Sequence, residues 1–128
     1  MPSWEDYKVQ AKTRGALALE LFVVETTPVG SLGTVQENLP AHLQYQRDLE
    51  SAGKLAFAGP LSDLSGNEMQ GCGMIIYRAD TIEEARQLAS DDPMHLSGAR
   101  SHTLRRWLIN EGSLSLNVGL STQSVTLS

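Results

Sequence analysis

The order in which strand-like and helix-like segments follow one another constrains the fold of this chain more than any other feature. Short runs rich in branched and aromatic apolar residues are typical of strands, whereas apolar residues spaced 3.6 apart indicate amphipathic helices. Strands are expected at residues 16–25, 55–58, 74–77 and 103–109, and helices at residues 34–52 and 81–92. The order β-α-β-β-α-β predicts an α+β, ferredoxin-like domain, in which two helices cover one face of a four-stranded antiparallel sheet.

The ends of both helices have recognisable signals. Thr34 and Thr81 each precede a glutamate by three residues, which is the spacing of a capping box. Gly53 follows the last turn of the first helix, and Pro93 stops the second. The polar residues 62–70 are expected to form a loop between the second and third strands.

The two ends of the chain add segments outside this pattern. Residues 113–128 contain strictly alternating apolar positions and are predicted to form extra C-terminal strands, and residues 1–15 form an N-terminal arm that carries Trp4, Tyr7 and Val9. Helices on one face leave the other face of the sheet bare. We therefore expect residues 1–128 to form one domain that pairs as a homodimer, with these arms covering the exposed face.

A histidine lies within the apolar stripe of the first helix. Val35, Leu39 and Leu43 mark that stripe, and His42 falls inside the same arc. A buried imidazole requires a polar partner and titrates near neutral pH. The first candidate partner is Asp92, with Asp91 as the alternative.

Charge and composition exclude several classes of protein. The formal net charge of -5 and the absence of a run of Lys or Arg argue against a nucleic-acid partner. No apolar run reaches the roughly 18 residues that a membrane span requires, and no signal peptide is evident, so a cytoplasmic location is expected. The single cysteine, Cys72, excludes an internal disulfide and a clustered thiolate zinc site.

Several short motifs occur together in an order that resembles YCII-related (YciI-like) proteins. They are Pro40-Ala-His-Leu43, Gly53-Lys-Leu-Ala-Phe-Ala-Gly-Pro60, Gly71-Cys-Gly-Met-Ile-Ile76, Glu84-Ala85, and Asp92-Pro93 with Gly98. The resemblance covers about residues 17–110. It implies the fold of the dimeric α/β-barrel superfamily, in which two sheets pack face to face, and a His-Asp site that falls on His42 and Asp92. The superfamily includes muconolactone isomerase-like and dehydrochlorinase-like enzymes.

Other side chains are candidates for ligand contacts. Gln46 lies one turn after His42 on the same stripe, Ser62 follows a strand-to-loop turn, and Arg105 belongs to an arginine-rich strand suited to a carboxylate or enolate. Ser62 and Arg105 also have structural interpretations, as a turn residue and as part of a solvated edge. A metal bound by His42, Asp92 and His95 is the less favoured alternative, because no helix offers ligands at i and i+4.

Two functions remain open from the sequence. The favoured hypothesis is a cofactor-independent enzyme acting on a small metabolite, an isomerase or a dehydrochlorinase-like lyase, in which His42 moves a proton and Asp92 orients the imidazole. The alternative is a non-catalytic module that binds a small molecule or supports another enzyme, with His42 as a buried structural group.

Overall fold

The computed structural model describes residues 1–128 and divides into two compact units. The larger unit comprises residues 20–107, and the smaller comprises residues 1–19 and 108–128. No helix is both long and apolar enough to cross a membrane.

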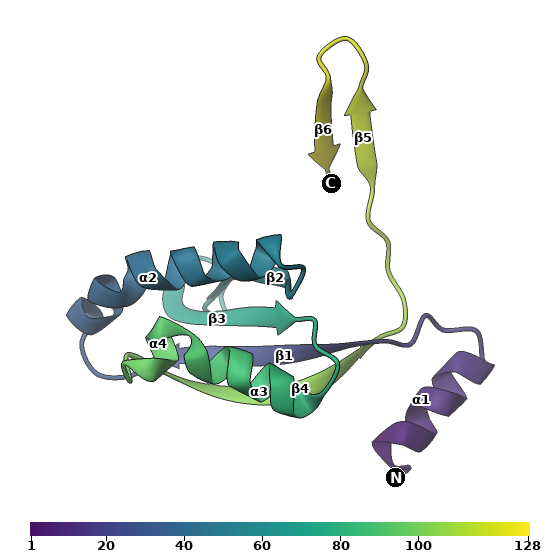
Figure 1. Cartoon of the computed structure of the whole chain (residues 1–128), viewed down its shortest axis with the longest axis horizontal. Helices are drawn as coiled ribbons and strands as arrows, with labels where there is room; N and C mark the ends of the chain where they lie inside the picture. Colours follow the sequence, from purple (N-terminus) through teal and green to yellow (C-terminus); the bar gives the residue numbers. More distant parts are fainter. The chain divides into compact units, whose positions relative to one another are not determined.

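The larger unit contains a four-stranded sheet in the order β2-β3-β1-β4 (Figure 1). Strand β3 runs antiparallel to both β1 and β2. Together with the two long helices between the strands, this order confirms the predicted ferredoxin-like fold. The strands are β1 (Leu19–Pro28), β2 (Leu55–Ser62), β3 (Met69–Tyr77) and β4 (Arg100–Ile109).

Both long helices pack against the same face of the sheet. Helix α2 spans Leu32–Ser51, α3 spans Ile82–Asp91, and the short α4 spans Pro93–Leu96. Alternate residues of β1 and β3 pack against both helices. The small residues of α3 allow this helix to approach the sheet closely. This core consists of Phe22, Val24, Ile75 and Tyr77 from the strands, Leu49 from α2, and Ala85 and Ala89 from α3.

Several predicted boundaries were wrong. Strand β1 is shifted to Leu19–Pro28, β2 continues past Gly59-Pro60 to Ser62, and β4 begins at Arg100 rather than Thr103. The N-cap of α2 is Ser31, whose hydroxyl accepts the amide of Thr34 at 3.3 Å, so the helix begins one turn earlier than expected. Strand β3 begins at Met69, within the segment predicted as loop, because Met69 pairs with Ser62 beyond an irregularity in the register. Thr81 caps α3 as predicted, and its hydroxyl accepts the amide of Glu84 at 3.1 Å.

The sheet face opposite the helices carries apolar side chains. Phe57, Ile76 and Val23 lie opposite one another across three strands, and none of them belongs to the core under the helices. Phe57 is 50% exposed and Trp107 of β4 is 43% exposed. Part of this apolar sheet face is therefore in contact with solvent, at Phe57 and Trp107.

The smaller unit is built from both ends of the chain. Residues of the predicted N-terminal arm form helix α1 (Trp4–Thr13), capped by Ser3, and Ala11 packs with Ala18 and Leu108. Strands β5 (Leu116–Gly119) and β6 (Ser124–Leu127) form an antiparallel hairpin, so the C-terminal segment does contain strands.

Candidate functional site

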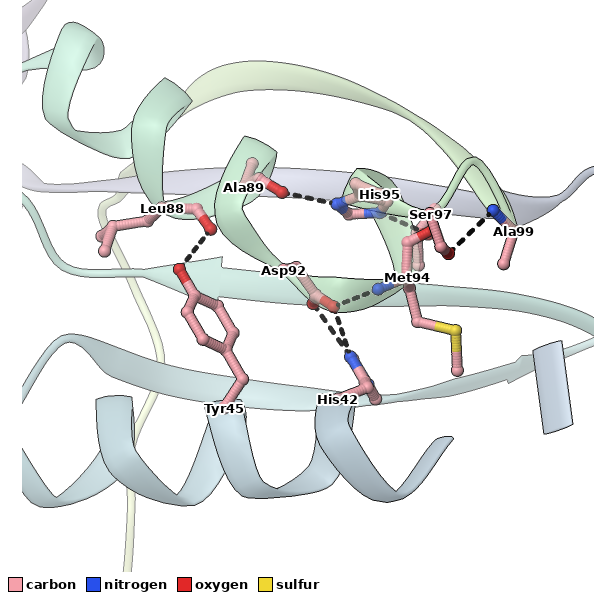
Figure 2. A network of polar contacts seen from close by, with 10 residues as sticks. His42, Tyr45, Leu88, Ala89, Asp92, Met94, His95, Ser97 and Ala99 are labelled. Atoms are coloured by element: carbon pink, nitrogen blue, oxygen red, sulfur yellow. Dashed lines mark hydrogen bonds and ion pairs between the residues drawn. The ribbon is translucent and has the colours of Figure 1, made fainter. Parts of the chain in front are cut away.

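His42 and Asp92 share a short hydrogen bond although 50 positions separate them in the chain. The Nδ1 atom of His42, on α2, lies 2.8 Å from Oδ1 and 2.9 Å from Oδ2 of Asp92 (Figure 2). The carboxylate is fully buried, whereas 15% of the histidine side chain is exposed. A buried carboxylate requires donors of this kind, because water cannot satisfy it.

The Asp92-Pro93 step places the carboxylate. A residue before proline is disfavoured in the helical region, and Asp92 is extended at φ -60° and ψ 127°. This extended residue ends α3 and also caps α4, because its Oδ1 accepts the amide of Met94 at 2.9 Å. Asp91, the alternative partner, is exposed and accepts the side-chain amide of Gln87 at 2.8 Å. The histidine therefore meets Asp92.

The hydrogen bond decides which nitrogen of His42 is available for chemistry. An ionised carboxylate only accepts, so the Nδ1 of His42 carries the proton that is donated to Asp92. The other ring nitrogen, Nε2, has no hydrogen-bond partner within the chain. In the neutral imidazole this atom has a free lone pair, which is the arrangement of a general base.

Two tyrosines lie behind the pair and stay neutral near physiological pH. The hydroxyl of Tyr45 donates to the carbonyl oxygen of Leu88 at 2.6 Å (Figure 2). Burial, together with the negative charges of Asp91 and Asp92, raises its pKa to about 12. Burial also raises the pKa of Tyr77, and Asp92 adds to the shift.

A cavity of about 370 Å³ adjoins His42. Its walls come from α2, α4 and all four strands of the sheet, and most of the lining side chains are apolar. The polar and ionisable side chains that line it are Thr26, His42, Gln46, Cys72, His95 and Arg100. A small, largely apolar cavity with a few convergent polar groups is typical of a site for a small organic molecule.

His95 uses both ring nitrogens on protein groups. Its Nδ1 donates to the carbonyl oxygen of Ala89 at 2.6 Å, and its Nε2 accepts the hydroxyl of Thr26 at 2.9 Å. Its ring centroid lies 4.1 Å from that of His102. Burial lowers the pKa of His102, His95 lowers it further, and Asp92 opposes the shift. His95 is therefore not arranged as a third metal ligand beside His42 and Asp92.

The other predicted ligand contacts fall in different places. Gln46 lines the cavity with His42, as expected of two polar residues on one stripe. Ser62 lies outside it and donates its hydroxyl to the carbonyl oxygen of Asp63 at 2.8 Å. Arg105 is exposed and does not line the cavity.

From the arginines at this strand, sequence reasoning selected Arg105 for the ligand contact and passed over Arg100. It lines the cavity and donates from Nη1 to the carbonyl oxygen of Gly71 at 2.6 Å. Side chains alternate along a strand, so Arg100 shares a face with Leu104, which packs against the core, whereas Arg105 points to the other face. This alternation was the signal that could have distinguished them.

Comparison with known proteins shows the family to which this chain belongs. The model of the YCII-related domain matches residues 21–108, which is most of the chain. The chain belongs to the YCII-related family. The match contains both His42 and Asp92, and the family model does not extend to α1 or to the terminal hairpin.

Two relatives illustrate the similarity. The chain is 29% identical over 76 residues to the uncharacterised protein YjpA of Bacillus subtilis (strain 168), covering 59% of this chain and 82% of YjpA. Among solved structures it resembles the 5-chloro-2-hydroxyhydroquinone dehydrochlorinase TftG of Burkholderia phenoliruptrix AC1100, in complex with 2,5-dihydroxybenzoquinone. That similarity has a TM-score of 0.56 and 25% identity, and covers 68% of this chain and 92% of TftG.

Proposed function

We propose that this protein is an enzyme that transfers a proton on a small organic molecule, with His42 as the acid-base group. The observation that carries this proposal is the hydrogen bond from Nδ1 of His42 to the buried carboxylate of Asp92. The carboxylate fixes the tautomer and the orientation of the ring, and it stabilises the imidazolium that forms when Nε2 takes a proton. Asp92 acts here as a positioning residue.

The chemistry that suits such a base is removal of a proton from a carbon next to a carbonyl or an equivalent activating group. Nε2 takes the proton and the electron pair of the C–H bond moves into an enolate. The enolate then either regains the proton at another carbon, which is isomerisation, or expels a leaving group with its bonding electrons, which is elimination. A positioned base of this kind contributes roughly 10²–10⁴-fold to the rate.

The similarity to TftG supports the elimination branch. TftG is a dehydrochlorinase by name, so its reaction class removes the elements of hydrogen chloride. Membership of the YCII-related family and the His42–Asp92 hydrogen bond together support elimination or isomerisation as the reaction class. An identity of 25% does not show that the two proteins act on the same substrate.

We further propose that the protein acts as a homodimer in the cytoplasm. The sheet face that carries Val23, Phe57 and Trp107 is apolar and partly exposed. A second copy of the chain can bury it by packing its identical sheet face against it. The alternative function is a non-catalytic module that binds a small molecule. The cavity and its lining suit that alternative equally, so a rate measurement decides between the two.

The deciding experiment measures catalysis in the wild type and two matched variants. Purified protein is mixed with 5-chloro-2-hydroxyhydroquinone to follow chloride release, and with a panel of enolisable keto acids in D₂O to follow deuterium incorporation by NMR. We expect acceleration above buffer that falls roughly 10²-fold or more in His42→Ala. Asp92→Asn should also lose activity, whereas Asp91→Asn, which alters a neighbouring exposed carboxylate, should keep it. Equal rates for wild type and His42→Ala would refute the acid-base role.

A further inference from the structure

Arg100 is the only side chain with a permanent charge on the wall of the cavity. The lining includes no Asp, Glu or Lys, and Asp92 lies behind His42 rather than on the wall. Both ring nitrogens of His95 are occupied by hydrogen bonds to the carbonyl oxygen of Ala89 and the hydroxyl of Thr26. The cavity therefore presents one positive group within a largely apolar surface.

The guanidinium is held in place by the sheet itself. Arg100 begins β4, and its Nη1 reaches past β1 to the carbonyl oxygen of Gly71 on β3 at 2.6 Å. Gly71 has φ +90°, and a Cβ there would lie 2.9 Å from Cγ of Pro28 on β1. A residue without a side chain is required for β3 to present this carbonyl so close to β1. Fixing one donor restricts the orientation of the others, since the guanidinium is planar.

The remaining donors of Arg100 are free for a ligand. A guanidinium carries five N–H groups, and only the bond to Gly71 is made within the chain. No carboxylate of the chain forms an ion pair with it, unlike Arg106, which contacts Glu20 at 3.1 Å. A partly buried guanidinium without a counter-ion favours an anionic oxygen, which it can bind through two parallel hydrogen bonds.

We propose that the cavity takes an organic anion, a carboxylate or ionised enol on a compact apolar body, with its charged oxygen on Arg100. This inference deepens the proposed function, because it assigns the substrate class of the same site and places the reactive C–H bond toward His42. An enolate that forms next to Arg100 gains negative charge close to the guanidinium, so the same contact also favours proton removal.

Two probes of the same shape test the charge requirement. Benzoate and benzamide are both flat, and they differ in that only benzoate is charged. Each is titrated into the wild-type protein and followed through backbone amide shifts of cavity residues by NMR. We expect benzoate to bind about tenfold or more tightly than benzamide, the ratio that one charge-assisted hydrogen bond supplies. Equal affinities, or no binding of benzoate at tens of millimolar, would overturn the proposal without any variant.

Three variants locate the anion. Arg100→Gln should weaken benzoate about tenfold or more and leave benzamide unchanged, whereas Arg105→Gln, an exposed arginine of the same strand, should leave both unchanged. His42→Ala should still bind benzoate, because the carboxylate is proposed to bind Arg100 and not His42. An unchanged benzoate affinity in Arg100→Gln would refute the assignment. Charge-dependent binding at Arg100 without turnover of any tested substrate would refute the proposed enzyme and leave the anion site standing.

Discussion

The Nη1 atom of Arg100, on β4, lies 2.6 Å from the carbonyl oxygen of Gly71, two strands away on β3. This contact crosses β1 at Pro28, against which Gly71 packs without a side chain. The side chain of Arg100 thereby links β4 to β3 across β1 at the wall of the cavity. Both the position of the positive charge and the local backbone depend on a glycine that bears no functional group.

Gly71→Ala should destabilise the protein by about 1–3 kcal/mol, because alanine is strained at positive φ and its Cβ meets Pro28. The free energy of unfolding in urea measures this loss. Gly59→Ala is the matched control, since Gly59 lies on the neighbouring strand β2 with ordinary φ and nothing within 4 Å of an added Cβ. Equal stability of the two variants would show that the close approach of Gly71 to Pro28 is easily relieved.

Asp92→Asn should change the titration of His42, because the imidazole loses the ionised acceptor that favours its protonated form. Histidine ring signals followed by NMR across pH report this change directly. A double-mutant cycle with His42→Ala should give an interaction energy of about 0.5–3 kcal/mol, the range for residues in contact. Asp91→Asn provides the control, since Asp91 contacts Gln87 instead. A His42 titration unaffected by Asp92→Asn would contradict the coupling.

The sequence predicted the contact between His42 and Asp92 from the order of the elements together with the resemblance to YCII-related proteins, whose Asp-Pro step favoured Asp92 over Asp91. The β-α-β-β-α-β order places both helices on one face, and the Asp-Pro step fixes where the second helix ends. Arg100 was not selected because the fourth strand was predicted to begin at Thr103, so Arg100 lay outside the alternation that assigns side chains to the two faces. The N-cap of α2 was mispredicted because Ser31 and Thr34 both have capping hydroxyls, and only the backbone conformation distinguishes them. Both features are determined by tertiary packing, which local sequence patterns do not encode.

His102 should make the protein less stable in acid. Burial lowers its pKa in the folded state below the ordinary value of 6.5, so the unfolded chain takes up the proton first as the pH falls. The stability that the neutral ring contributes is present above pH 6.5 and is lost as the pH falls through the folded pKa. His102→Gln should remove this part of the slope in urea unfolding measured between pH 7 and pH 5. The other two histidines are present in both proteins, so the difference between the two curves isolates His102. A wild-type slope equal to that of the variant would contradict the lowered pKa.

The terminal hairpin should contribute to association through one of its two faces. Leu116 lies opposite Leu127 and Val118 opposite Val125, so four exposed apolar side chains share a face, and polar residues such as Asn117 occupy the other. An isolated two-stranded hairpin is only marginally stable in water, which favours burial of its apolar face against a partner surface.

Truncation after Gly112 should therefore lower the melting temperature or weaken dimerisation. A sharper comparison uses two neighbouring lysine substitutions, since adjacent strand residues point to opposite faces. Val118→Lys should shift the monomer-dimer equilibrium toward monomer in sedimentation equilibrium, because a charge would be buried or the face left uncovered. Asn117→Lys adds the same charge to the polar face and should leave the equilibrium unchanged. If the wild type sediments as a monomer of 13.9 kDa at micromolar concentration, the proposed dimer is wrong. If both variants dimerise like the wild type, the hairpin face plays no part in association.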